Sequence, residues 1–201
     1  MKKKFNITGV CYPHLHYMMD TSQKLKEVMA MVEEGEYFII NRPRQYGKTT
    51  TLFLLAEELT KSADYIAIEM NFQGIDEQWH ESDQAFAQMF LNQLQKSLEY
   101  GKPEAYSLVN QLEKVVTGMD ALSDVISELV RKLTKKVVLI IDEVDASSNF
   151  EPFLSFLGML RTKYLARFKP HQATFHSIVL AGVYDIKSLK SKIRNSKFKT
   201  N

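Results

Sequence analysis

Residues 136–145, KVVLIIDEVD, constrain the fold more than any other stretch of the chain. Within it the run 137–141 is continuously apolar and lacks the polar alternation of a half-exposed strand, so it predicts a strand that is buried on both faces. Such strands occur mainly in parallel sheets that helices cover on both sides, which indicates the α/β fold class. The run ends in Asp142 and Glu143, at the strand end where open α/β sheets bind ligands. We therefore expect a ligand site beside these two acids.

Helical and strand patterns alternate along the rest of the chain, as in a succession of βαβ units. The helix expected before the first strand ends at Gly35, and Ser148 with Glu151 is expected to form a capping box at the start of the last helix. The predicted strands cover residues 36–40, 63–72, 136–145 and 177–185. The predicted helices cover residues 20–34, 49–62, 82–101, 104–116, 120–136 and 151–168.

Residues 41–50, NRPRQYGKTT, stand between the first predicted strand and the next helix. Gly47, Lys48 and Thr49 fill the final fixed positions of the phosphate-binding loop G-x-x-x-x-G-K-[ST], and Arg42 replaces its first glycine. The amides at the helix start would point at an anion, Lys48 would reach the β- and γ-phosphates of a nucleotide, and Thr49 would ligate Mg²⁺. The residues expected to bind nucleotide in this loop are Arg44, Gln45, Tyr46, Gly47, Lys48, Thr49 and Thr50.

The acids that end the third predicted strand complete such a site. Asp142 would hold Mg²⁺ directly or through water, and Glu143 would orient and polarise the attacking water. With Lys48 as the second catalytic residue, this predicts a Mg²⁺-dependent module that binds ATP and hydrolyses its β–γ phosphoanhydride. The alternative for the loop is a solvated helix start, and the alternative for the acids is an ordinary strand exit. Asp145 is equally compatible with a place in this site and with capping of the following turn.

The chain resembles the AAA-ATPase-like family of predicted bacterial ATPases, relatives of the STAND NTPases, over about residues 5–194. The stretches that carry the resemblance are HYMMDTS, EYFIINRPRQYGKTTTL, VVLIIDEVD and VLAGVYDIKSLKSKIR. The most specific element is R-P-R-x-x-G-K-[ST], which members carry in place of a glycine-initiated loop. The resemblance implies a three-layer P-loop NTPase core of the ASCE/AAA type. It also implies a polar sensor at the end of the fourth strand, at Tyr184 or Asp185, of which Asp185 is the expected nucleotide contact.

In this family a further core strand and a helical lid follow the sensor strand, and many members continue into a PD-(D/E)xK nuclease-like region. We therefore expect a lead-in segment and helix over residues 1–34, and over residues 35–201 an ATPase core that lacks the lid and the last core strand and turns over slowly. A homo-oligomer could supply Arg161 or Arg167 to a neighbouring site, although ordinary surface arginines are the simpler interpretation. Tyr17 could border the base, although a packing role is the simpler expectation there too. No residue distinguishes ATP from GTP.

Composition excludes few other classes. The chain of 201 residues has 26 basic and 24 acidic side chains, a balance that gives no argument for nucleic acid, and a single cysteine, Cys11, which fits the cytoplasm. We expect no membrane anchor, because no apolar run reaches the length of about 18 residues that a span needs. Cys11 with His14 and His16 is too few ligands for structural zinc. Two functional alternatives are a nucleotide-dependent conformational switch and nucleic-acid binding by the basic tail at residues 187–199.

Overall fold

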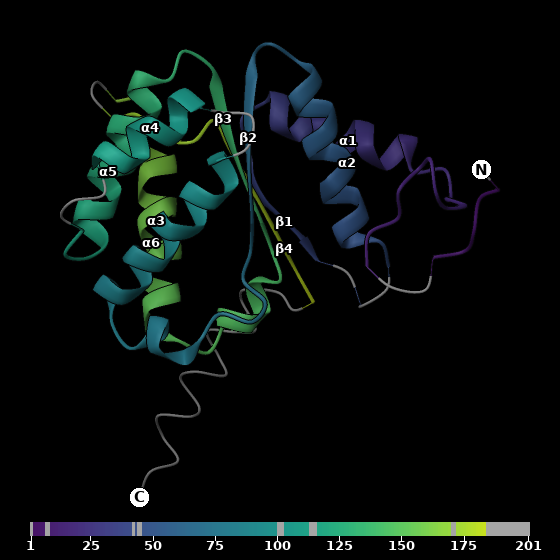
Figure 1. Cartoon of the computed structure of the whole chain (residues 1–201). Coiled ribbons are helices and arrows are strands. Elements are labelled where there is room, and N and C mark those ends of the chain that lie inside the picture. Colours follow the sequence, from purple (N-terminus) through teal and green to yellow (C-terminus); the bar gives the residue numbers. More distant parts are fainter. Residues whose placement is uncertain are drawn as a thin grey trace, which may run out of the picture.

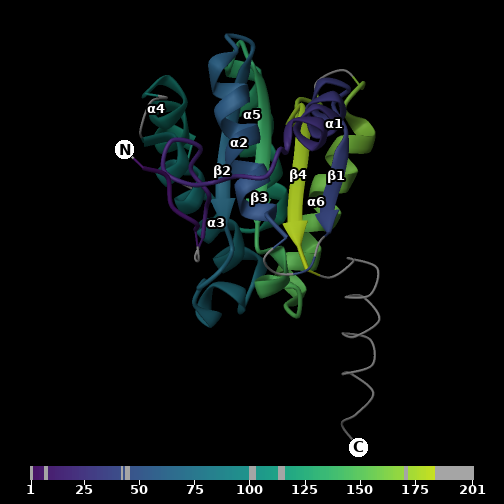
Figure 2. The same cartoon turned by 90° about the vertical axis from the view of Figure 1, so that its right-hand side faces the viewer.

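The computed structural model describes residues 2–6, 9–41, 43, 46–99, 103–112, 116–169 and 172–183. The strands of this part are β1 (Tyr37–Asn41), β2 (Tyr65–Asn71), β3 (Lys136–Asp142) and β4 (Ser177–Gly182). They form one parallel sheet with the order β1-β4-β3-β2. Figure 2 shows them side by side and running in the same direction. The predicted α/β class with a parallel sheet is therefore confirmed.

Each predicted helix is present, with ends shifted by a few residues. The α helices are α1 (Ser22–Glu33), α2 (Lys48–Lys61), α3 (Asp83–Glu99), α4 (Pro103–Leu112), α5 (Met119–Lys132) and α6 (Glu151–Ala166). Two short 3-10 helices were not predicted, η1 (Glu77–His80) and η3 (Val144–Ser147). In the described part of the chain, none of the helices is long and apolar enough to cross a membrane.

The three layers follow from the alternation of side chains along β3. Val138 and Ile140 point to one face of the sheet and pack with residues of α1 and α2. Val137, Leu139 and Ile141 point to the other face and join the core under α3, α4, α5 and α6. Figure 1 shows these two groups of helices on opposite sides of the sheet. Burial of both faces explains why β3 has no polar alternation.

The face under α3 to α6 holds a cluster of buried aromatic rings. Phe72, Phe86, Phe90, Phe153 and Phe156 are each 0% exposed. Their ring centroids lie 4.8–6.2 Å apart, mostly in tilted or edge-to-face pairs. Burial of each ring stabilises the fold by about 1.5–3 kcal/mol, so this layer anchors β2, β3 and the helices that follow them.

Three details differ from the sequence-based expectations. The first strand was expected to be buried, but β1 is an outer strand of the described sheet and its residues are partly exposed. The third strand ends at Asp142 and not at Asp145, because Glu143 takes a left-handed conformation. The capping box of Ser148 and Glu151 is absent: the Ser148 hydroxyl donates to the carbonyl of Asp145, and no side chain caps α6.

Candidate functional site

The loop between β1 and α2 ends in a residue that the conformation requires to be glycine. Gly47 precedes α2 with φ 74° and ψ 22°, in the left-handed region that a side chain would strain. No side chain caps α2, and its N-terminus lies at the carboxyl end of the sheet, where its first-turn amides face the ligand side. The positive end of a helix dipole favours an anion at such a position. This geometry fits the phosphate-binding role expected from the sequence.

A short hydrogen bond joins α2 to the end of β3. The Thr49 hydroxyl donates to Oδ2 of Asp142 over 2.7 Å, across 93 residues of sequence. The other carboxylate oxygen, Oδ1, accepts the backbone N–H of Glu143 over 2.8 Å. Asp142 is 5% exposed, and Lys48, one residue before Thr49, is 6% exposed. The structure thus brings together the predicted loop and acid residues at one end of the sheet.

Glu143 holds an unusual backbone conformation beside this pair. Its φ is 53° and its ψ is 40°, and it is the one non-glycine residue with positive φ in the described part of the chain. The left-handed conformation costs a non-glycine residue about 1–2 kcal/mol. Residues held in this way cluster at functional sites, because the surroundings must impose the strain.

Asp145 ties the end of β3 to the end of β4. Its carboxylate accepts the backbone N–H of Val183, and it lies so close to Gly182 that a Cβ there would be 2.9 Å from Oδ1. From the sequence, Asp145 was equally compatible with a place in the acid site and with capping of the following turn. Its contact with β4 was not predicted. A glycine at the strand end was the only signal that pointed to it.

The site also has support that sequence reasoning missed. From η1, Nε2 of the buried His80 lies 2.9 Å from Oγ of Ser147 in η3, and its ring stacks on Phe150 with centroids 4.0 Å apart. Burial lowers the pKa of His80 below its ordinary value, although a backbone contact at Asp76 and the charge of Glu77 act in the opposite direction. A neutral ring therefore packs beneath the turn that follows the two acids.

The segment before α1 covers the other side of α2. The backbone N–H of Cys11 donates to the hydroxyl of Thr50 over 3.1 Å, and the Tyr12 ring meets Phe53 edge-on at 5.2 Å. Thr50, expected to bind nucleotide, is thus already an acceptor for the lead-in segment. Tyr17, considered as a border of the base or as a packing residue, lies against the exposed ring of Phe5 at 5.0 Å and is half-exposed.

The remaining candidates lie outside this cluster or outside the described residues. Tyr46, the loop residue directly before Gly47, is 67% exposed. Arg161 lies on α6, and the Arg167 guanidinium stacks 3.8 Å from the Tyr164 ring centroid, at the C-terminal end of that helix. The residues that fall outside the described part are Arg42, Arg44, Gln45, Tyr184, Asp185 and the basic tail at residues 187–199.

The donor set suits a magnesium ion more than a soft metal. A hydroxyl and a carboxylate converge at Thr49 and Asp142, and Mg²⁺ prefers such oxygen ligands. Among the described residues, no group of three or more His, Cys, Asp and Glu side chains could hold a metal ion. Mg²⁺ at a nucleotide site needs fewer protein ligands, because phosphate oxygens and waters complete its coordination.

The comparison with protein families agrees with this geometry. The model of the AAA-like domain matches residues 14–199, a range that includes the loop before α2, the acids after β3 and the end of β4. No curated protein matches the sequence. The relation to STAND NTPases and to a nuclease-like region stays a prediction. The chain belongs to the AAA-like domain family and is a nucleotide-binding module of the ATPase type.

Proposed function

We propose that the chain binds Mg²⁺-ATP at the carboxyl end of its sheet and hydrolyses the β–γ phosphoanhydride. The observation that carries this proposal is the 2.7 Å hydrogen bond between Thr49 and Asp142. In P-loop NTPases the loop threonine and the acid of the second motif hold Mg²⁺ together. A bound Mg²⁺ would neutralise charge on the β- and γ-phosphate oxygens.

Binding of the phosphates would rest on α2. The uncapped amides that follow Gly47 would donate to phosphate oxygens, and the helix dipole would favour their charge. The Lys48 side chain is almost fully shielded from water, so its ammonium group would act on the phosphates with little solvent screening. Together these groups explain affinity for a polyphosphate.

Glu143 would act on the attacking water. Its carboxylate would take the proton of the water as the water oxygen attacks the γ-phosphorus in line. The bond from that phosphorus to the β–γ bridging oxygen breaks, and ADP leaves with this oxygen. Asp145 would hold the backbone of Val183 in place, just before the proposed sensor residues Tyr184 and Asp185.

Calorimetric titration with ATP, with and without Mg²⁺, tests the proposal. Lys48→Ala should weaken binding by at least about tenfold, because a charge-assisted contact to phosphate is lost. Lys61→Ala is the matched control: this exposed lysine lies at the other end of α2, pairs with Glu58 at 2.9 Å and should leave affinity unchanged. Equal affinity in both variants would reject the site.

Phosphate release, measured on the same samples, separates the proposed hydrolysis from its main alternative. Turnover that depends on Mg²⁺ supports an ATPase. Tight binding with no phosphate release would instead support a nucleotide-dependent conformational switch.

A further inference from the structure

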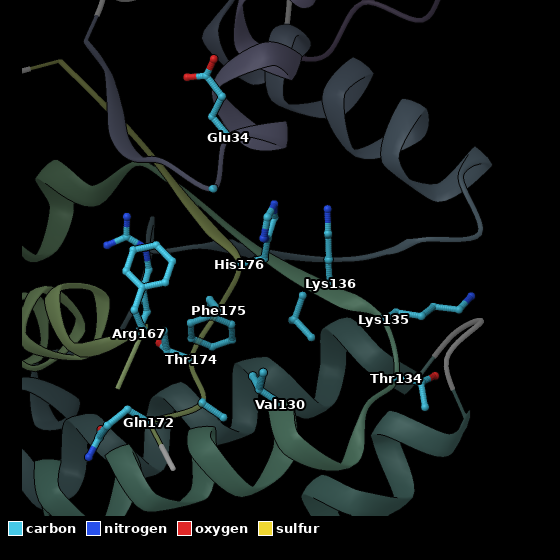
Figure 3. A pocket seen from close by; sticks show the side chains of 14 residues that line it. Glu34, Val130, Thr134, Lys135, Lys136, Arg167, Gln172, Thr174, Phe175 and His176 are labelled. Atoms are coloured by element: carbon cyan, nitrogen blue, oxygen red, sulfur yellow. The ribbon is translucent and has the colours of Figure 1, made fainter. Parts of the chain in front are cut away.

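A second cavity lies at the opposite end of the sheet, and Figure 3 shows its lining. Its volume is about 420 Å³, within the range of small-molecule sites. The wall comes from the segments that precede β1, β3 and β4 and from the end of α6, because parallel strands begin at one end of the sheet. The length of β3 separates this cavity from Asp142 by roughly 20 Å. The two sites are therefore distinct.

The lining is rich in positive charge. It includes Lys135, Lys136 and Arg167, against the single acid Glu34. None of these three cations forms an ion pair with another described residue. In Figure 3 Lys136 and Arg167 stand on either side of His176, whereas Lys135 extends away from it.

Arg167 is held in place before any ligand arrives. Its guanidinium lies 3.8 Å from the centroid of the Tyr164 ring and 4.3 Å from that of Phe168. One of its amino groups also donates to the carbonyl of Tyr164 over 2.8 Å. A guanidinium fixed in this way loses little conformational freedom when it binds an anion.

Two polar atoms in the same wall have no hydrogen-bond partner among the described residues. They are Nε2 of His176 and Oγ1 of Thr174, and both are shielded from solvent. Buried polar atoms in native proteins are almost always satisfied by protein, water or ligand. Their position beside unpaired cations favours a ligand that carries several hydrogen-bonding oxygens.

We propose that this cavity binds a small phosphate-bearing molecule between Lys136 and Arg167. Because Oγ1 of Thr174 and Nε2 of His176 are shielded from solvent in the free chain, a rotation of each side chain would bring them into hydrogen bonds with this molecule. A phosphate group offers several charged oxygens to donors that converge from different directions, which suits two cations and a hydroxyl better than a single carboxylate does. The apolar side chains of Val130 and Phe175, also in the lining, would contact the remainder of the molecule.

The protonation of His176 should change when the anion binds. Burial and the charge of Lys136 lower the pKa of the free ring, while the carbonyls of Val32 and Glu33 act against this shift.

An anion beside the ring favours its charged form, so binding should take up a proton and make both ring nitrogens donors. The other groups around the ring are Arg167 from α6, Glu34 after α1, Lys135 before β3 and the Tyr65 ring of β2 at 5.9 Å. Affinity should therefore increase as the pH falls toward the ordinary pKa of histidine, about 6.5.

The test uses inorganic pyrophosphate as the probe and the full chain carrying Lys48→Ala, which removes the proposed phosphate contact at the other end of the sheet. Nuclear magnetic resonance of the His176 ring nitrogens reports binding at this cavity, and calorimetry gives the affinity. The double variant Lys136→Gln/Arg167→Gln should weaken binding by at least about tenfold. Lys132→Gln, an α5 lysine outside the lining that pairs with Glu128 at 2.7 Å, should not.

Two results would overturn the proposal. One is a His176 spectrum that does not change when pyrophosphate is added. If Lys48→Ala fails to fold, the same spectrum can be recorded on the wild-type chain. The other is equal affinity of the double variant and Lys132→Gln. Citrate that binds as tightly as pyrophosphate would reject the preference for phosphate. None of these outcomes depends on ATP binding at Thr49 and Asp142.

Discussion

At the carboxyl end of the sheet the carboxylates of Asp142 and Asp145 have hydrogen-bond partners, whereas at the amino end two buried polar atoms have none among the described residues. Asp142 accepts from Thr49 and from the backbone of Glu143, and Asp145 accepts from Val183. At the other end, Nε2 of His176 and Oγ1 of Thr174 lack such partners. The acids at one end are thus held before a ligand arrives, although Nδ1 of His80 beneath them also lacks a partner among the described residues. The other end would gain its missing contacts from a ligand.

This difference has a physical cause in the direction of the strands. Loops at the carboxyl ends lead into α2 and η3, whose amides and turns supply donors close to the acids. Segments at the amino ends enter the sheet directly and bring lysine, arginine and histidine side chains together around an open space. The following changes test how far each end depends on these contacts.

The largest effect is expected from Glu143→Gln. Loss of a general base commonly reduces turnover by about 10²–10⁴-fold, while ATP affinity should stay near that of the wild type. Phosphate release and calorimetry measure the two quantities. Equal losses of rate and affinity would show that Glu143 organises the site and does not activate water.

Glu143→Gly tests the backbone strain at this position separately from the role of the side chain. Glycine accepts the observed φ of 53° without strain, so this variant should lose turnover yet gain up to about 1 kcal/mol in the free energy of unfolding. Chemical denaturation measures that gain. A destabilised glycine variant would mean that contacts of the Glu143 side chain outweigh its backbone strain.

Gly182→Ala should disrupt the hydrogen bond between Val183 and Asp145, which joins the end of β4 to the turn after β3. The added Cβ would lie 2.9 Å and 3.1 Å from the two Asp145 carboxylate oxygens and 3.0 Å from a methyl carbon of Val144. We expect a loss of about 1–3 kcal/mol in the free energy of unfolding, as for overpacked sites. Gly158→Ala on α6 is the control, because nothing lies within 4 Å of the new Cβ. It should stabilise the helix by about 0.5–1 kcal/mol, and equal effects of the two changes would contradict the close contact.

A smaller loss of stability is expected from Asp142→Asn, together with a weaker dependence of ATP binding on Mg²⁺. An amide offers one acceptor oxygen, so when that oxygen accepts the N–H of Glu143 the Thr49 hydroxyl must accept from the amide nitrogen instead of donating to a charged oxygen, at a cost of about 1 kcal/mol. Denaturation and titrations with and without Mg²⁺ measure both effects. Asp64→Asn, at an exposed acid before β2, should change neither quantity. An unchanged Mg²⁺ dependence in Asp142→Asn would remove this residue from the metal site.

The sequence predicted the parts of this molecule that depend on local patterns. The apolar run of β3 and the fixed spacing of Gly47, Lys48 and Thr49 are properties of short stretches, so they were enough to indicate the sheet and the candidate site. The predicted capping box failed because the Ser148 hydroxyl found a nearer partner in the carbonyl of Asp145. A local motif of this kind competes with other hydrogen bonds that sequence alone does not rank.

The supports of the site were not predictable for a different reason. These supports are hydrogen bonds between residues that lie far apart in the sequence. The pairs are Cys11 with Thr50, His80 with Ser147 and Asp145 with Val183, with sequence separations of 39, 67 and 38 residues. Only the packing of whole layers brings such pairs together. The amino-end cavity has no motif either, because its cations come from separate segments with no fixed spacing.

The smallest effect is a pH dependence that distinguishes the two ends through His80 and His176. Burial lowers the pKa of each ring in the folded chain. The unfolded chain, with a histidine pKa of about 6.5, then binds more protons, so stability is fully present above that pH and decreases as the pH falls below it. Each ring can contribute a slope of at most about 1.4 kcal/mol per pH unit.

Phosphate should separate the two contributions, because an anion in the amino-end cavity raises the pKa of His176 and leaves the ring of His80 unaffected. Unfolding is measured between about pH 5 and 8 in chains that carry Lys48→Ala, which removes the proposed phosphate contact at the carboxyl end. Its pH dependence should become shallower with phosphate when His176 is present, both with and without His80→Gln. In His176→Gln the remaining slope comes from His80, which is 6% exposed beneath η3, so phosphate should not change it. A phosphate effect that persists in His176→Gln would place the anion elsewhere and remove the proposed difference between the two ends of the sheet.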